Sequence, residues 1–555
     1  MRSASFLLPA AILLALAGCA TVGPDYAAPE LQGPELWQNA PETLPTAGTA
    51  RLARWWEQLN DPLLTDLIRQ ALASSPDLRL AQARLRESRA RGALAEAGLA
   101  PTLDASGSAS RGQSSAETGT GATRNVFSAG FDARWEADLF GGTRRAIEAA
   151  RADLQGSEAS LKDTQVTLAA EVARNYIELR AAQARLRIAR DNLASQTETL
   201  NLTEWRAQAG LTSALEVEQA RANREQTRAQ IPPLETSLAA AEYRLAVLLG
   251  ETPGALYARL APPQPIPAAP APLAVGIPAD TLRQRPDVRV AERRLAAETA
   301  RIGQAEAARY PALSLSGSIG LDALALDGLT GGQALSRSIL AGLTAPIFDG
   351  GRLRSQVDVQ TAVRDQAAVS LEQTVLGALE EVENALVALA RGREREAALA
   401  EATASARKAA ELARQRYASG LIDFQTVLTT ERSVLTLEDS LASAQASTTQ
   451  ALIQLYKALG GGWSATPEMT SSCRHCEPSE AIQVPPPHGL PRRLAPNGHG
   501  DSPPQDMKRL LAMSVSLTPA LSRLRERGTM ERIALFHVYA TLAHARNDAA
   551  ARTNT

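Results

Sequence analysis

Over most of its length, the sequence lacks the side chains on which catalysis and metal binding most often depend. All five histidines lie after Trp463, and no cysteine stands between Cys19 and Cys473. The body of the chain therefore contains no histidine base or ligand and no thiol nucleophile. We also find no phosphate-binding loop. These absences predict a protein that is not an enzyme and that requires neither a cofactor nor a metal ion.

Aromatic residues and excess charge are also scarce. Phe, Trp and Tyr make up 4% of the 555 residues, and the formal net charge is −2. A protein without a strongly basic surface is not expected to bind nucleic acid. Alanine, leucine, arginine and glutamate dominate instead, and this composition is typical of long helices and coiled coils.

Two long stretches, 143–209 and 352–419, have the pattern of coiled-coil helices. In the first, apolar residues stand seven apart, with a single step of four, at Leu154, Leu161, Leu168, Val172, Leu179, Leu186, Leu193 and Leu200. A seven-residue repeat keeps one apolar stripe facing a partner helix, and a step of four locally unwinds the supercoil. No proline interrupts this stretch, so a continuous helix would be about 100 Å long. A rod of this length suits a protein that spans a wide gap.

The N-terminus has the features of a secreted lipoprotein. A positively charged start precedes an apolar run that is too short to cross a membrane. The run ends in leucine, alanine, glycine and Cys19, which resembles the bacterial lipobox. We therefore predict a signal peptide over 1–18, lipidation of Cys19, and a lipidated tether over 19–60 whose proline-rich part, 20–50, is extended. The alternative is an ordinary secretory signal beside an unrelated cysteine.

The second half of the chain repeats the first. A constant offset of 210 positions (286 − 76) relates Pro76 to Pro286, Pro101 to Pro311, Gly107 to Gly317, Glu171 to Glu381, Gly210 to Gly420 and Gly250 to Gly460. Such self-similarity predicts two tandem copies of one supersecondary unit. We place the copies at 61–250 and 278–463, with a connector over 251–277.

Each copy is predicted to contain the same elements in the same order. An opening helix comes first, at 62–100 and 278–310, and a proline ends it. A pair of strands follows, at 102–140 and 312–347, where the hydrophobic period changes to two. A long helical hairpin completes each copy, at 143–249 and 352–460. The predicted fold class is therefore mainly α with a small β part.

The strands alternate apolar and polar residues. Over 126–140, one face carries the aromatic residues Phe127, Phe131 and Trp135, and the other carries Asp132, Arg134, Glu136 and Asp138. One interpretation is a soluble sheet with one packed face and one wet face. The other is the wall of a transmembrane barrel, apolar toward lipid and polar toward the lumen. Four strands cannot close a water-filled barrel alone, so the second interpretation requires several chains.

Several short motifs resemble the outer-membrane efflux proteins of the TolC-like family, in particular its lipoprotein, NodT-type branch. These motifs are Trp55-Trp56, Asp61-Pro62-Leu63, Trp135-Glu136-Ala137-Asp138-Leu139-Phe140-Gly141, Arg285-Pro286-Asp287, Tyr310-Pro311 and Pro346-Ile347-Phe348-Asp349-Gly350-Gly351. The resemblance implies a homotrimer in the outer membrane of a Gram-negative bacterium. Three chains of four strands would share a twelve-stranded barrel, continuous with a helical tunnel that projects into the periplasm. Asp132, Arg134, Glu136 and Asp138 would then line a wet lumen.

The resemblance also assigns roles to the ends of the rods. Gly210-Leu211 and Gly420-Leu421 stand where helix-stopping glycines are expected, and they resemble the hairpin tips through which the family meets its periplasmic adaptor protein. A helix turn without a partner is the alternative interpretation. The adaptor in turn implies an inner-membrane efflux pump as the third component.

A further set of residues follows the second tip. In the family, an aspartate and an arginine here help to close the periplasmic aperture; Arg432 matches the arginine, and Thr429 stands where the aspartate is usual. We assign Gln425, Thr429 and Arg432 to this aperture. Asp423 or Glu431 could supply the missing carboxylate. The alternative is that Arg432 is an ordinary solvated charge on a helix.

The final residues, 464–555, have no counterpart in this family. We expect disorder or an extended reading frame there. The single Cys473-x-x-Cys476 pair lacks a second pair and is a weak zinc motif. The family resemblance implies a passive exit duct for small molecules. A duct for secreted polypeptides and a non-conducting periplasmic coiled-coil lipoprotein are the alternatives.

Overall fold

The structure is a computed structural model that describes residues 21–30, 37–39, 52–269 and 282–463. All of these belong to one compact unit that ends at Glu468. The predicted signal peptide, the predicted lipidation site Cys19 and the predicted tail at 464–555 lie outside the described residues. Within the described ranges, no helix is both long enough and apolar enough to cross a membrane.

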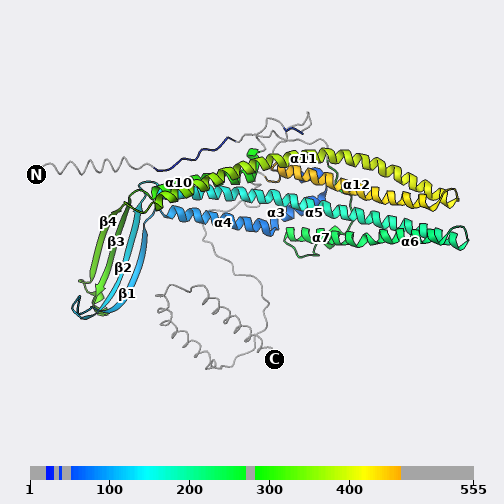
Figure 1. Ribbon diagram of the computed structural model, residues 1–555. Coiled ribbons are helices and arrows are strands. Elements are labelled where there is room, and N and C mark those ends of the chain that lie inside the picture. Colours follow the sequence, from blue (N-terminus) through cyan, green and yellow to red (C-terminus); the bar gives the residue numbers. More distant parts are fainter. Residues whose placement is uncertain (1–20, 31–36, 40–51, 270–281, 464–555) are drawn as a thin grey trace, which may run out of the picture. The chain divides into compact units, whose positions relative to one another are not determined.

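The described residues are mostly helical, and one order of elements occurs twice (Figure 1). The first copy contains η1 (Trp55–Leu59), α3 (Pro62–Ser74), α4 (Pro76–Ala97), β1 (Thr102–Gln113), β2 (Thr123–Ala137), α5 (Gly142–Gln208), α6 (Ala214–Ala229) and α7 (Ile231–Leu249). After α8 (Tyr257–Leu260), the second copy contains α10 (Pro286–Ala307), β3 (Ala312–Ala323), η2 (Leu326–Thr330), β4 (Leu335–Thr344), α11 (Arg352–Ala418) and α12 (Phe424–Ala458). The predicted fold class, mainly α with a small β part, is confirmed.

The two predicted rods are the helices α5 and α11, each 67 residues long. Each begins after a glycine in the left-handed conformation, Gly141 or Gly351. At 1.5 Å per residue, each helix is about 100 Å long. Five of the eight residues of the predicted apolar stripe of α5 are buried, namely Leu168, Val172, Leu179, Leu186 and Leu200. Packing along this stripe, more than helix propensity, stabilises so long a helix.

Three predicted helices are interrupted where the chain approaches a proline. The helix expected over 62–100 breaks at Ser75, and the one expected over 278–310 breaks at Arg285. A proline follows each of these residues and pushes it into an extended conformation. The second limb of the first hairpin divides at Gln230, because the two prolines that follow Ile231 have no N–H to continue the helix. The second hairpin has no such prolines, and α12 is continuous.

The four strands form one antiparallel sheet in the order β1-β2-β3-β4. Phe131 pairs with Ala105 on one side and Ile319 on the other, while Asp132 pairs with Asp104 and Ser318. The strand pairs of the two copies are therefore joined edge to edge, with apolar and polar side chains on opposite faces as the alternation predicts. Strand β2 ends at Ala137 rather than at the predicted Phe140. The sheet lies at one end of the helical bundle (Figure 1).

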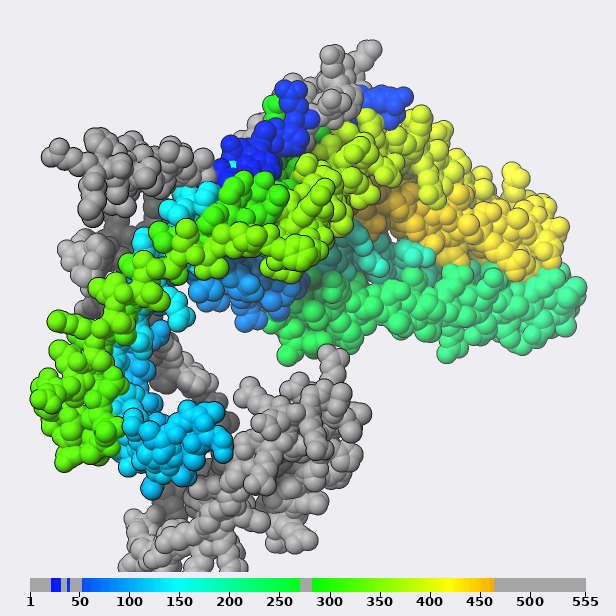
Figure 2. All heavy atoms as spheres, turned by 60° about the vertical axis from the view of Figure 1, so that its left-hand side comes forward, coloured from blue at the N-terminus to red at the C-terminus, as the bar shows by residue number. Residues whose placement is uncertain are grey.

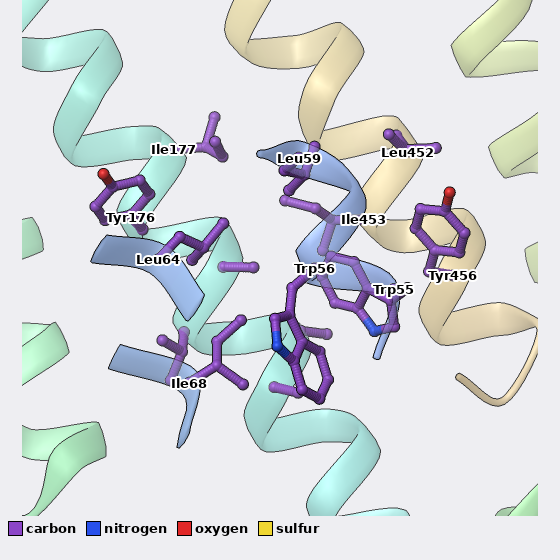
Figure 3. Close-up of a cluster of buried hydrophobic side chains, with 14 of the residues drawn as sticks. Trp55, Trp56, Leu59, Leu64, Ile68, Tyr176, Ile177, Leu452, Ile453 and Tyr456 are labelled. Carbon is purple, nitrogen blue, oxygen red and sulfur yellow. The ribbon is translucent and has the colours of Figure 1, made fainter. Parts of the chain in front are cut away.

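The largest hydrophobic core lies where α5 and α12 pass the N-terminal segment (Figure 3). Trp55 is fully buried and stacks on Tyr456 of α12, with 5.3 Å between ring centroids. Tyr176 of α5 donates a 2.6 Å hydrogen bond to Asp61, which also caps α3. The predicted tether over 19–60 is therefore corrected at 55–59, because these residues form a short helix whose two large indoles are buried in the core.

The connector is also packed. Leu256 and Leu260 are buried in the same core, and the carbonyl oxygen of Pro262 accepts a 2.9 Å hydrogen bond from Arg180 of α5. Farther along, the carbonyl oxygen of Pro267 accepts one from Thr449 of α12. The described part of the connector, 251–269, therefore binds the two hairpins to each other.

Candidate functional site

Among the described residues of a single chain, nothing covers either face of the sheet. Phe131, on the apolar face of β2, is 54% exposed, and Ile339 on β4 is 86% exposed. In the part of the chain that the structure describes, strands β1 and β4 have a strand neighbour on one side only. The unpaired N–H and C=O groups of an edge strand are a template for pairing with another chain. The sheet therefore has the geometry of one part of a larger sheet.

The polar face of the sheet is organised by hydrogen bonds between strands. Serine hydroxyls bond across the strands in the pairs Ser106–Asp132, Ser108–Ser128, Ser318–Ser338 and Ser336–Asp322. Asp132, Arg134 and Glu136 alternate with the apolar residues of β2 and share this face. Asp138 does not, because it follows the end of the strand. Its carboxylate accepts hydrogen bonds from the backbone N–H groups of Thr143 and Arg144 in the first turn of α5.

The predicted tips have a well-defined helix-ending geometry. Gly210 and Gly420 adopt φ values of 73° and 74°. The N–H of Leu211 donates to the carbonyl of Arg206, and the N–H of Leu421 donates to the carbonyl of Arg416, at 2.8 Å in each case. This is the Schellman motif, which needs a residue that tolerates positive φ. Both leucines face solvent and are 68% and 73% exposed.

The two tips are packed against each other, at the end of the unit away from the sheet (Figure 2). Arg206 of α5 donates a 2.7 Å hydrogen bond to the carbonyl of Tyr417 in α11, and its guanidinium lies over the tyrosine ring. Tyr417 also packs on Phe424, the first residue of α12. The hairpins of the two copies therefore end as one joined surface.

The predicted aperture residues lie on an exposed side of α12. Gln425 donates a 2.7 Å hydrogen bond to Gln219, and Arg432 Nε donates a 2.9 Å hydrogen bond to Asn223; both acceptors are on α6. The hydroxyl of Thr429 instead donates to the carbonyl of Gln425 in its own helix. Gln425 and Arg432 therefore link the two hairpins, and Thr429 does not.

Sequence reasoning did not identify Gln219 and Asn223 as partners. Their four-residue spacing puts them on one side of α6. The duplication could have indicated these partners. The offset of 210 relates Thr429 to Gln219 and Arg432 to Ala222, which is next to Asn223. The two copies thus present equivalent helix faces to each other.

Both carboxylates predicted as substitutes for the missing aspartate have other roles in α12. Asp423 is the N-cap of the helix, and hydrogen bonds from Thr426 lower the pKa of its carboxyl. Glu431 is buried between helices, where its carboxylate accepts a 2.7 Å hydrogen bond from Thr199 of α5 and lies 3.7 Å from Arg414 of α11. The helical period turns Glu431 inward, because it lies two positions after Thr429.

The burial of Glu431 predicts a pH dependence. Burial raises the pKa of its carboxyl above the ordinary value, against smaller opposing effects of Thr199 and Arg414. The folded state therefore binds the proton more tightly than the unfolded state. This contribution to stability is complete below the ordinary pKa and is lost as the pH rises through the raised one. We expect thermal stability to increase as the pH falls from 7.5 toward 5.

The matched variant is Glu431→Gln, which keeps the shape of the side chain and removes the titration. Thermal unfolding of the purified protein, followed by circular dichroism at both pH values, measures the effect. The variant should lose part of the pH dependence seen in the unmodified protein. An unchanged difference between pH 5 and pH 7.5 in the variant would assign the effect to other groups.

Among the described residues, no group of three or more histidine, cysteine, aspartate or glutamate side chains is arranged to hold a metal ion. The polar residues described above instead line a sheet face, cap helices or link hairpins. The polar side chains of the sheet can keep its face hydrated, and those of α12 and α6 can hold the two helical hairpins together.

Comparison with known proteins supports the architecture. The profile described as outer membrane efflux protein matches residues 67–251 and 277–461, one match in each copy. Nodulation protein T of Rhizobium leguminosarum bv. viciae is 33% identical over 461 residues, which are 83% of this chain and 94% of that protein. The pyoverdine export outer membrane protein OpmQ of Pseudomonas putida is 34% identical over 481 residues, covering 83% and 97% of the two chains.

A solved structure has the same fold. The outer-membrane channel OprN superposes with a TM-score of 0.72 at 36% identity, covering 80% of this chain and all of that one. The double profile match, the identities and the shared fold agree with one another. This chain belongs to the outer membrane efflux protein family.

Proposed function

We propose that this protein is the outer-membrane exit duct of a tripartite efflux system. It conducts small molecules passively from a periplasmic adaptor and an inner-membrane pump to the outside. The observation that carries the proposal is the sheet, apolar on one face and polar on the other, joined to two hairpins about 100 Å long. A related protein is described as an export outer membrane protein, which supports the same direction of transport.

The duct is a homotrimer. The free edges of β1 and β4 allow each sheet to pair with a neighbouring chain, and three four-stranded sheets close one barrel in lipid. Exposed Phe131 and Ile339 then face acyl chains, while Asp132, Arg134 and Glu136 keep the lumen wet. Closure removes the free edges that a single chain leaves unpaired.

The ends of the molecule have separate roles. Lipidation of Cys19 anchors the chain in the outer membrane, and the helices project into the periplasm. The exposed side chains of Leu211 and Leu421 supply apolar contacts for the adaptor, on tips that are already fixed to each other. The duct itself performs no catalysis, and the pump supplies the energy for transport.

The links from α12 to α6 restrict the periplasmic aperture. Each link is a partly exposed hydrogen bond, for which a net value of about 0.5–1.5 kcal/mol is usual. Arg432→Ala removes the bond to Asn223 in every chain of the trimer. We expect the variant to increase single-channel open time or conductance severalfold in planar bilayers. Thr429→Ala is the matched control, because that hydroxyl bonds only within its own helix, and it should leave conductance unchanged.

The same recordings test the function itself. A folded trimer of the unmodified protein should show at least small, discrete conductance steps, and a strain that lacks the protein should become more susceptible to toxic small molecules. A folded trimer that never conducts, even as Arg432→Ala, would instead support a structural lipoprotein. Loss of polypeptide secretion without any change in susceptibility would identify a duct for secreted polypeptides.

A further inference from the structure

The first described segment of the chain lies against the junction between the sheet and the helices. The N–H of Val22 donates a 3.1 Å hydrogen bond to the carbonyl of Phe140, just after β2. Thr21 lies so close to Gly141 that a Cβ on that glycine would come within 2.5 Å of the threonine methyl group. Figure 2 shows residues 21–30 in dark blue over the green helix α10. This segment is therefore docked at the junction.

Two glycines make the close approach possible. A Cβ on Gly23 would lie 2.3 Å from the Cα of Gly303 in α10. Conversely, a Cβ on Gly303 would lie 2.8 Å from the carbonyl oxygen of Val22 and 2.9 Å from the side chain of Arg145. Glycine in a helix interior disfavours the helix, so Gly303 has a local disadvantage that the docked segment explains.

A buried arginine holds the docked segment in place. Arg145 of α5 donates from Nε to the carbonyl of Val22 at 3.1 Å and from Nη2 to the carbonyl of Gly23 at 3.1 Å. It also pairs with Asp25 and Glu148, each at 2.8 Å. The arginine is only 4% exposed. A charge this well buried needs such partners, and three of its four bonds go to residues 22–25.

The duplication separates the role of these residues from that of the repeat fold. The offset of 210 relates Arg145 to Ser355 and Gly303 to Ala93. The second copy builds the same strand-to-helix turn, from Gly351 into α11, without either residue. The arginine and the glycine are therefore not required by the turn. They are present where the N-terminal segment docks.

The junction also has the composition of a membrane–water boundary. Phe140 stacks on Tyr310, with 4.7 Å between ring centroids, and the tyrosine is partly exposed. Ile347 and Phe348, at the corresponding turn after β4, are almost fully exposed. Aromatic residues gather at such boundaries in membrane proteins. The N-terminal end of the docked segment thus lies beside a surface whose aromatic residues suit contact with lipid headgroups.

We infer that Arg145 and Gly303 form a latch that positions the acylated N-terminus at this junction and so sets the depth of the barrel in the membrane. Cys19 precedes Thr21 by two residues, which reach about 7 Å at most. Acyl chains on Cys19 therefore enter the lipid beside Phe140 and Tyr310, and the anchor and the barrel wall are held in register. The inference rests on the proposed lipid-anchored duct, and it makes Arg145 and Gly303 positioning residues.

The first test is release of the docked segment. Gly303→Ala favours the helix and fills the space that Val22 occupies, so it should displace the segment without unfolding α10. Arg145→Gln removes the charge and most of the hydrogen bonds. In the full-length trimer, cleavage after Asp25 by an aspartate-specific protease should accelerate at least tenfold in both variants. Gly92→Ala, at an open helical glycine of α4, is the control and should not accelerate cleavage.

The second test separates a latch for the anchor from general support of the fold. Gly303→Ala should lower the amount of outer-membrane trimer severalfold when Cys19 is acylated. It should have no further effect in a Cys19→Ser form that is exported by a non-lipoprotein signal. Equal losses in both backgrounds, or unchanged cleavage after Asp25, would overturn the latch. Mass spectrometry that finds no acyl group on Cys19 would also overturn it, whereas conductance of the same trimer would leave the proposed duct standing.

Discussion

Replacing Phe131 with arginine (Phe131→Arg) is expected to remove the assembled trimer from the outer membrane. The side chain lies on the apolar face of β2, between Ala105 and Ile319 of the adjacent strands. In the proposed barrel it faces lipid near the middle of the strand. Arginine at the midplane of a barrel costs about 2–4 kcal/mol per site, and a trimer carries the change three times. The sum, about 6–12 kcal/mol, rivals the whole stability of many folded proteins.

Asp132→Arg is the matched control, because it places the same new side chain one residue along, on the opposite face. The substitution removes an exposed hydrogen bond that Ser106 donates to the Asp132 carboxylate. Trimer should assemble, with altered ion selectivity because three positive charges replace three negative ones in the lumen. Outer-membrane fractionation followed by native electrophoresis measures both variants. Equal assembly of the two variants would contradict the assignment of the faces, and so would failure of Asp132→Arg alone.

Replacing Trp55 with alanine is expected to have the largest effect on the helical part. The indole is fully buried where η1 meets α5 and α12, and it contacts Trp56 edge to face as well as stacking on Tyr456 (Figure 3). Truncating such a side chain costs about 3–5 kcal/mol, because the cavity relaxes only partly. We expect a marked fall in the urea midpoint of unfolding, or loss of folded protein from the cell.

Trp205→Ala is the control, because it removes the same side chain from a position on α5 where the indole is 66% exposed. Its removal should change the free energy of unfolding by no more than about 0.5 kcal/mol. Urea titrations followed by circular dichroism at 222 nm give both midpoints. Similar shifts for the two variants would mean that the N-terminal segment adds little to the core.

Local sequence signals predicted the elements well. The heptad repeat predicted α5, the two-residue alternation predicted the faces of β2, and Gly210 and Gly420 marked the tips. Each signal depends on residues close together in the chain, where helical and strand periods apply directly. The same reasoning missed the interruptions at Ser75 and Arg285, although the prolines that cause them were visible.

Contacts between distant residues could not be predicted in the same way. No local pattern indicates that Trp55 stacks on Tyr456, or that Pro262 accepts a bond from Arg180. The hydrogen bond from Arg432 to Asn223 joins residues more than two hundred positions apart. Whether it forms depends on how the two helical hairpins are rotated relative to each other, which no local pattern predicts. The helical period alone could have predicted that Glu431 points inward. The alternation could not predict that β2 ends at Ala137, before Asp138, because the end of a strand depends on its neighbouring strands.

The pairing of β2 with β3 has a consequence for how the ring is built. That seam joins copy to copy within one polypeptide, and in the proposed trimer the seam from β4 to the next β1 repeats it between polypeptides. The ring is then six quasi-equivalent modules supplied as three covalent pairs. Tethering each pair raises the effective concentration of its halves and leaves only three encounters to complete closure. Because the two halves are separate stretches of one chain, each can also acquire its own residues. Arg145 in the first half and Ser355 in the second, at equivalent positions after the strand-to-helix turn, illustrate this.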